Sequence, residues 1–397
     1  MKGPLSGFRV IDLSSVLSGP AATVLLADQG ADVIKVEPPA GDIVRRMGRG
    51  HDSLSPAFVA ANRGKRSVCL NLKEATGVEV VKKLVTGADV FVQNFRPGAI
   101  ERMGLSYEVL QSINPALLYV SVSGFGEQGP YSHKRVYDPV IQALTGLPDM
   151  QADAAEARPK MVRTVIPDKV SALTTAQAIT AALLERERGD GTGQHIKVAM
   201  LDATISFLWP EALAGLTMVG QEHNVRTGQL AQDLIFQTRD GYITCGAVSD
   251  DEWRGMCAAL DRPDWLDDER FNTPLGRVQN AKARLESMSD VLSSRTSAEW
   301  LERLDAEDVP CAPVLTRPEI LENEQVKANE LIHEYNHPSL GEIRQPRPGA
   351  RFSRSELRKE PIAPMLGEHS KEVLQETGIS DADIERLIKE NILMARD

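Results

Sequence analysis

The feature that most constrains the fold is an alternation, along the first 125 residues, of short apolar runs rich in β-branched residues with stretches of helical character. The run at 8–14 is followed by a helical stretch at 20–30 and a second run at 32–37, which is the pattern of a β-α-β unit. The rhythm continues with runs at 67–72, 89–95 and 117–125 and helical stretches at 74–87 and 99–113. Near-continuous apolar strands separated by helices predict a parallel sheet covered on both faces, a doubly wound, Rossmann-like α/β domain.

The texture changes along the rest of the chain. A long helix is predicted at 170–189, ended by Gly189, and an extended segment at 195–201. The run FQTRDGYITCGAV then predicts a hairpin around Asp240 and Gly241. Amphipathic helices are predicted at 252–260, 276–294 and 297–307. These elements together predict a second, smaller α+β domain.

The predicted domain plan therefore has four parts. They are a first part of the large domain (1–205), a linker (206–232), the small domain (233–315), and a return linker with the C-terminal part of the large domain (316–397). The last part is rich in Pro and polar residues, and we expect it to wrap back over the large domain.

Charge and cysteine usage limit the surroundings in which the protein works. The formal net charge is −11, which argues against partners such as nucleic acid or an anionic membrane surface. No segment reaches the roughly 18 uncharged apolar residues of a membrane helix, and the first 20 residues lack a signal-peptide core. The four cysteines (Cys69, Cys245, Cys257 and Cys311) make no CxxC pair, so we expect reduced thiols in a cytoplasmic protein.

Several common kinds of site are missing from the sequence. The first βα turn, SSVLSGP at 14–20, lacks the glycine spacing of a dinucleotide site, and no Walker A segment occurs. The seven histidines form no zinc-binding spacing, so no metal site is expected, and no G-x-S-x-G elbow is present. Carboxylates and clustered Lys and Arg residues remain as the informative side chains. Grouped basic residues in loops of an acidic chain favour an anionic ligand.

Ordered motifs across nearly the whole chain resemble the family III CoA-transferases, the group that includes formyl-CoA transferase and carnitine CoA-transferase. The motifs are GFRVIDLSSVLSGPAATVLLADQGADVIKVEPP, NRGKRSVCLNLK, VQNFRPGAIERMG, SVSGFGEQGPY, RGDGTGQHIKVAMLDA, VPCAPV, HPSLGEIR and MLGEH. The resemblance implies a large domain made from both chain ends, a smaller inserted domain, and a homodimer of two interlocked subunits. It also implies acyl-CoA and a small carboxylic acid as substrates, with no tightly bound cofactor.

The resemblance identifies Asp168, in TVIPDKVSAL, as the carboxylate nucleophile. A carboxylate attacks a thioester to give a mixed anhydride, and the released CoA thiolate can return to give an aspartyl-CoA thioester. Backbone N–H groups at a helix N-terminus are expected to stabilise this carboxylate as the anion. Taken without the resemblance, Asp168 is more simply read as a helix N-cap.

The resemblance also implies the residues that contact CoA. They are Val16, Leu17, Ser18, Leu70, Asn71, Leu72, Lys73, Asn94, Phe95, Arg96, Arg102, Lys134, Arg135, Val136 and Tyr137. One departure concerns the position after Glu37, where several relatives carry an Arg but this chain has Pro38. We expect either that Arg45 or Arg46 replaces that nucleotide contact or that the contact is weaker. Asp138 corresponds to an acidic position near the active site, or it caps the helix that follows it.

Two alternatives stay open. An α-methylacyl-CoA racemase of the same fold would use a His and an Asp as acid and base, but Tyr137 stands where that His is expected, and a phenol with a pKa near 10 is a poor base at neutral pH. His133 lies nearby in the sequence. A non-catalytic CoA-binding protein would be expected to lack Asp168. The resemblance implies that oxalate is a disfavoured acceptor, because the small domain lacks the Gly-rich run of the oxalate-using members of the family. Succinate, malate, mesaconate, a carnitine-like acid or an aromatic acid remain open.

Overall fold

The computed structural model describes residues 3–48, 54–152, 158–222, 234–357 and 361–396. The chain divides into two compact units. The first unit contains residues 1–148, 161–208 and 330–397, and the second contains residues 149–160 and 209–329. Residues 223–232 of the predicted linker and residue 233 of the predicted small domain lie outside the described residues.

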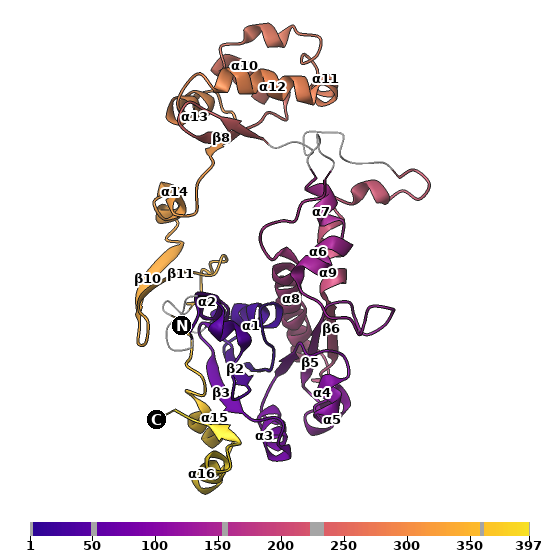
Figure 1. The fold of residues 1–397 in the computed structure, drawn as a ribbon, viewed down its shortest axis with the longest axis vertical. Coiled ribbons are helices and arrows are strands. Elements are labelled where there is room, and N and C mark those ends of the chain that lie inside the picture. The colour runs from indigo at the N-terminus through magenta and orange to yellow at the C-terminus, as the bar shows by residue number, and fades with distance from the viewer. Residues whose placement is uncertain (1–2, 49–53, 153–157, 223–233, 358–360, 397) are drawn as a thin grey trace. The chain divides into compact units, whose positions relative to one another are not determined.

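The first unit is built on one seven-stranded sheet (Figure 1). Its strands are β1 (Arg9–Asp12), β2 (Asp32–Glu37), β3 (Arg66–Leu70), β4 (Val90–Gln93), β5 (Leu118–Ser123), β6 (His195–Ala199) and β12 (Leu393–Met394). The spatial order is β12-β3-β2-β1-β4-β5-β6, and every pairing is parallel except that of β12 with β3. The direction of strand succession changes at β1, so a crevice is expected where the loops after β1 and β4 diverge.

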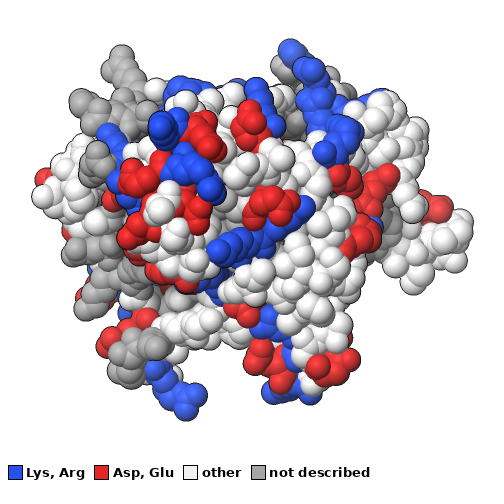
Figure 2. Space-filling view, turned by 90° about the horizontal axis from the view of Figure 1, so that it is seen from below, with Lys and Arg blue, Asp and Glu red and all other residues white. Residues whose placement is uncertain are grey.

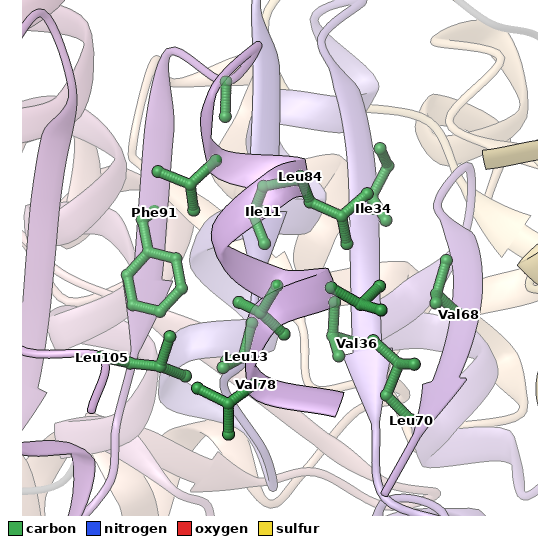
Figure 3. Packing of buried hydrophobic residues seen from close by; sticks show 14 of the residues in the cluster. Ile11, Leu13, Ile34, Val36, Val68, Leu70, Val78, Leu84, Phe91 and Leu105 are labelled. Atoms are coloured by element: carbon green, nitrogen blue, oxygen red, sulfur yellow. The ribbon is translucent and has the colours of Figure 1, made fainter. Parts of the chain in front are cut away.

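Helices cover both faces of this sheet, as the alternation of apolar runs predicts. One face packs against α1 (Ser18–Asp28) and α8 (Ile166–Arg188), whose buried Leu26 and Ile179 join Val33 and Val120 in one core cluster. The other face packs against α3 (Ala75–Val85), α5 (Tyr107–Ile113), α15 (Ser370–Glu376) and α16 (Asp381–Lys389). Figure 3 shows Leu84 of α3 lying over Ile11 and Ile34 of the strands. The predicted α/β parallel-sheet core is confirmed.

Some predicted elements are wrong in their bounds. The single helix expected at 99–113 is two helices, α4 (Ala99–Arg102) and α5, because the chain turns at Gly104 with φ +77°. Helix α8 begins at Ile166, four residues before its predicted start at 170. The short helix α2 (Pro56–Asn62) and the two-residue strand β12 were not expected.

The remaining elements of the first unit follow the sheet. They are α6 (Asp138–Leu144), α9 (Met200–Leu208), and the antiparallel hairpin β10 (Ile332–His337) with β11 (Gly341–Pro346). Helix α7 (Leu147–Met150) lies where the division between the units falls. The C-terminal segment belongs to the first unit, with the His369 backbone N–H donating to the Ser67 carbonyl at 2.9 Å.

The second unit combines a small antiparallel sheet with helices. The sheet has the order β7 (Ile235–Gln237), β8 (Tyr242–Cys245) and β9 (Cys311–Pro313), which confirms the predicted hairpin. The helices are α10 (Asp250–Ala259), α11 (Pro274–Gln279), α12 (Ala281–Leu292), α13 (Ser297–Ala306) and α14 (Glu324–Ala328). The helix expected at 276–294 is therefore two helices. Stacked Trp253 and Trp265 lie in the apolar core of this unit.

Three further observations concern the surface charge, the cysteines and the helices. Figure 2 shows a face on which Lys and Arg are interspersed with Asp and Glu. All four cysteines are free, and three of them are buried. None of the described helices is long and apolar enough to cross a membrane.

Candidate active site

The turn after β1 and the start of α1 form one wall of the site. Helix α1 begins at Ser18, which is buried, and Leu17 occupies its N-cap position without a side-chain cap bond. Val16 has φ +69°, a left-handed conformation that a β-branched residue adopts only when its surroundings hold it there. The three residues expected to contact CoA here, Val16, Leu17 and Ser18, therefore lie at the carboxyl end of β1, on the edge of the sheet where ligands bind in such folds.

Helix α8 carries Asp168 in its first turn. The helix begins at Ile166 with Pro167 as its second residue, and Val165 is the N-cap. Asp168 is the third residue of the helix, so the alternative reading of Asp168 as an N-cap is wrong. Its half-buried carboxylate lies close enough to the backbone N–H of Ser18, the first residue of α1, for that N–H to lower the carboxylate's pKa.

A second carboxylate, that of Asp138, lies beside Asp168. Asp138 is the first residue of α6 and is 3% exposed. One of its oxygens accepts the Asp168 backbone N–H at 3.2 Å, and the other accepts the side-chain amide of Gln142 at 2.6 Å. These bonds connect α6 to α8, so Asp138 helps to position the first turn of α8 instead of serving only as a cap of its own helix.

Gln142 is a site residue that the sequence analysis missed. Its amide nitrogen also donates to the carbonyls of Val162 and Thr164, and its amide oxygen accepts the Val162 backbone N–H at 3.1 Å. Gln142 thus fixes the segment that leads into α8. Its position four residues after Asp138 on one helix is the signal that could have identified it, since residues at that spacing share a helix face.

The environment of Asp168 changes its acidity. Burial raises the pKa of Asp168, the neighbouring carboxylate of Asp138 raises it further, and the Ser18 N–H lowers it, so that the pKa settles at about 6. The Ser18 N–H favours the anion, in the direction expected for backbone N–H groups at a helix N-terminus, but burial and a like charge outweigh it. A carboxylate with a pKa near 6 is ionised at neutral pH and is more basic than an ordinary aspartate.

The segment before α6 lies next to this pair. Tyr137 is the N-cap residue of α6, and its side chain is 71% exposed. Lys134 and Arg135 are exposed, and the Lys134 ammonium lies 3.6 Å from the centre of the Tyr131 ring. Val136 packs against Gly124, where a larger residue would collide with it. Tyr137 and the two basic side chains are thus open to a ligand.

Three of the exposed basic side chains expected to meet CoA follow strands of the same sheet. Lys73 follows β3, whereas Arg96 and Arg102 follow β4, and all three are exposed. Asn71, Leu72 and Phe95 are partly buried in the same turns. Leu70 differs, because its side chain is fully buried in the core beneath the sheet, so only its backbone could meet a ligand.

Two expected CoA contacts have other roles in the structure. Arg45 is 2% exposed, and its guanidinium bonds both carboxylate oxygens of Glu37 at 2.6 and 2.7 Å. Its guanidinium also lies 3.7 Å from the centre of the Phe58 ring. This geometry favours a structural role, and we leave Arg45 out of the proposed CoA site. The side chain of Asn94 bonds the backbone of Ser15 on both sides.

The donor set suits acyl chemistry better than metal chemistry. Within the described ranges, no group of three or more His, Cys, Asp or Glu side chains is arranged to hold a metal ion. The site brings together Ser18, Asp138 and Asp168, which are one backbone donor and two carboxylates. Such a set can supply a nucleophile and stabilise charge near it.

A doubly wound sheet with a half-buried aspartate at its carboxyl edge defines an α/β protein equipped for covalent or acid–base chemistry. Comparison with known families makes this specific: residues 5–370 match the model of CoA-transferase family III, and the chain belongs to that family.

Named relatives agree with this assignment. The chain is 34% identical to the succinyl-CoA:glutarate CoA-transferase of Mus musculus, with 98% of this chain and 90% of the relative covered. It is 33% identical to the formyl-CoA:oxalate CoA-transferase of Streptomyces coelicolor, with 97% of this chain and 98% of the relative covered. A crystal structure of a CAIB/BAIF family protein from Brucella suis is 31% identical with a TM-score of 0.83, covering 95% of this chain and all of that one. The chain is therefore a transferase of the CoA-transferase class.

Proposed function

We propose that the protein moves CoA from an acyl-CoA to a carboxylic acid through covalent intermediates on Asp168. The observation that carries this proposal is the placement of the Asp168 carboxylate, half-buried, beside Asp138 and against the Ser18 backbone N–H. A carboxylate so placed is ionised at neutral pH but poorly solvated, which makes it a better nucleophile than an exposed aspartate.

The proposed reaction balances without a metal or redox group. The Asp168 carboxylate attacks the thioester carbonyl, the C–S bond breaks, and CoA leaves as the thiolate. The thiolate then attacks the aspartyl carbonyl of the mixed anhydride, which releases the donor acid as a carboxylate and leaves an aspartyl-CoA thioester. The acceptor carboxylate attacks that thioester, which forms a second mixed anhydride and releases the CoA thiolate. The thiolate then attacks the acceptor's acyl carbon of this anhydride and gives the new acyl-CoA. Asp168 is restored as the carboxylate.

The Ser18 backbone N–H is suited to stabilise the negative charge that forms on oxygen during attack at the aspartyl carbonyl. It already favours the charged form of the Asp168 carboxylate, so it lies on the side where negative charge forms when that carbon becomes tetrahedral. Removing one well-placed donor of this kind typically costs about 3 to 4 kcal/mol of activation free energy.

CoA is proposed to bind along the carboxyl edge of β1, β3 and β4. The exposed side chains of Lys73, Arg96 and Arg102, together with Lys134 and Arg135 before α6, are suited to its phosphates. The acceptor remains a prediction, with succinate, malate, mesaconate, a carnitine-like acid or an aromatic acid as candidates and oxalate disfavoured. The interlocked homodimer and the cytoplasmic location remain predictions too.

The experiment that tests the proposal is mass spectrometry of the protein after incubation with a panel of acyl-CoAs. Succinyl-CoA, formyl-CoA and acetyl-CoA belong in the panel because the relatives' names include these donors or acids. Hydroxylamine or borohydride is then added, and a hydroxamate or a reduced side chain at Asp168 is expected. An unmodified Asp168, with deuterium entering the acyl α-carbon from D₂O, would instead favour the racemase alternative; His133, which is exposed, is the histidine near Asp138 in the sequence.

A further inference from the structure

The short turn Ser14–Val16, between β1 and α1, is held by side chains, one of them from the end of β1 and the others from more distant parts of the first unit. Five consecutive backbone polar groups have such a partner: the N–H and C=O of Ser14, the N–H and C=O of Ser15, and the N–H of Val16. A turn normally satisfies these groups with water or with its own backbone. Here the partners are Asp12, Lys35, Asn94 and Asp42.

Asn94 holds the middle of this turn from both sides. Its amide oxygen accepts the Ser15 N–H at 2.9 Å, and its amide nitrogen donates to the Ser15 carbonyl at 2.8 Å. Because Asn94 follows β4 directly, these two bonds tie the turn after β1 to the neighbouring strand. Only a side chain with an acceptor and a donor on one planar group can make both bonds.

Asp42 holds the end of the turn, where the backbone is strained. Its carboxylate accepts the Val16 N–H at 3.2 Å and pairs with the buried ammonium of Lys35 at 3.1 Å. Lys35 in turn donates to the Ser14 carbonyl at 2.9 Å. The left-handed conformation of Val16 is costly for a β-branched residue, so these contacts are what keep it populated.

We propose that Asn94 and Asp42 are positioning residues, which hold the Ser14–Val16 turn so that the backbone N–H of Ser18 stays directed at the carboxylate of Asp168. The turn ends two residues before Ser18, and Leu17 makes no side-chain cap bond that could fix the helix start by itself. The direction of the Ser18 N–H therefore depends on the conformation of Val16. This inference rests on the proposed function of Asp168.

The direct test is Asn94→Ala, with Asn114→Ala as a matched control. Asn114 also bonds backbone on two sides, with its amide nitrogen on the carbonyls of Val85 and Ala88 and its oxygen on the Ala116 N–H. It lies before β5, at the opposite edge of the same sheet from Asn94. Both substitutions remove the same kind of contact from a partly buried site, so both should lower the thermal stability.

The two variants should differ in the pH dependence of acylation. The rate at which succinyl-CoA, or the panel member that acylates fastest, modifies the wild-type protein should fall on the acid side as Asp168 is protonated. In Asn94→Ala the midpoint of that fall should move up by about 0.5 to 1 pH unit, because the hydrogen bond that favours the anion is weakened. In Asn114→Ala the midpoint should stay at the wild-type value.

A second variant, Asp42→Asn, tests the inference through the direction in which the pH midpoint of acylation moves. It retains an oxygen to accept the Val16 N–H but loses the pairing with Lys35, so the turn should loosen and the midpoint should rise. Loss of a negative charge would by electrostatics alone lower the pKa of Asp168, and a fall in the midpoint would overturn the inference. This variant also tests the inference should Asn94→Ala not fold.

The outcomes separate this inference from the proposed function. If wild-type Asp168 is acylated but the midpoint is unchanged in Asn94→Ala, the positioning role is wrong and the proposed function stands. If wild-type Asp168 is never acylated by any panel member, the proposed function is wrong and the positioning role falls with it.

Discussion

Two carboxylates in the same unit, the buried Asp12 at the end of β1 and the half-buried Asp168 at the start of α8, have pKa values shifted in opposite directions. Asp12 is fully buried, and although burial alone would raise its pKa, the ammonium groups of Lys65 and Lys35 hold that pKa at about 2. Asp168 is less buried, yet its pKa is about 6. Burial is the largest single influence on both, so burial does not explain the difference.

The groups that surround each carboxylate explain the difference between the two pKa values. Asp12 accepts hydrogen bonds from Thr23 at 2.6 Å and from Lys65 at 3.0 Å, and the Ser14 hydroxyl also donates to it. Asp168 has one backbone donor and faces another acid. A carboxylate surrounded by cations is stable and unreactive, whereas one left with few partners is ready to form a covalent bond. Position within a fold does not distinguish structural from reactive acids, but the partners do.

The sharpest test of this contrast is Asp168→Asn. We expect acyl transfer to fall by about 10⁴-fold or more, since an amide cannot form the anhydride, while CoA binding is largely retained. Steady-state rates and CoA titration by calorimetry measure the two effects. Asp383→Asn is the matched control, because Asp383 is also the third residue of a helix, α16, and should keep full activity. Retained activity in Asp168→Asn would remove Asp168 from the mechanism.

The other carboxylate of the comparison, Asp12, is tested by Lys65→Met. This change leaves Asp12 fully buried without its nearest cation, so the free energy of unfolding should fall by about 3 kcal/mol. Urea unfolding at pH 7 measures it. Adding Asp12→Asn to the same chain should recover part of the loss. An unchanged urea midpoint for Lys65→Met would mean that Asp12 does not depend on Lys65.

The pH dependence of activity should follow Asp168 and not Asp12. Because the pKa of Asp168 is about 6 and the carboxylate is the reactive form, kcat/KM should fall about tenfold for each pH unit below 6. Rates between pH 4.5 and 8 with one acyl-CoA measure this. A profile that stays flat down to pH 4 would show that the acid is an ordinary, solvated aspartate.

The smallest expected effect concerns stability. A carboxyl group whose pKa is raised on folding destabilises the folded state when it is ionised, and this penalty disappears as pH falls below the unfolded-state value near 4. At pH 7 the free energy of unfolding of Asp168→Asn should therefore exceed that of wild type by about 1 to 2 kcal/mol. This difference should shrink as the pH falls toward 4. A variant less stable than wild type at pH 7 would contradict the assigned acidity.

The sheet could be predicted because each strand is an apolar run and each crossover is helical, so local pattern and fold agree. The start of α8 could have been placed better, since Pro167 suits the first turn of a helix and marks its beginning. The two-residue strand β12 could not be predicted, because it is too short to show a pattern and exists only through its pairing with β3.

The site was predicted less completely than the fold. Asp168 and Asp138 were identified through resemblance, and the structure brings them together. Gln142 and Asp42 were missed, and Arg45 was expected to contact CoA, because the sequence does not show which of several possible partners a polar side chain bonds in the fold. Arg45 and Glu37 are eight residues apart, and nothing in the sequence shows that the charge of one is used by the other.

The pairing of β12 with β3 also affects how the protein can be made. Leu393 lies opposite Leu70, so one edge of the main sheet is covered by a segment synthesised more than 300 residues after its partner. Until then β3 presents an open strand edge, which can pair with other chains. Nascent chains should accordingly depend on chaperones during synthesis, and proteins shortened by a few C-terminal residues should tend to aggregate even though no residue of the proposed site is lost.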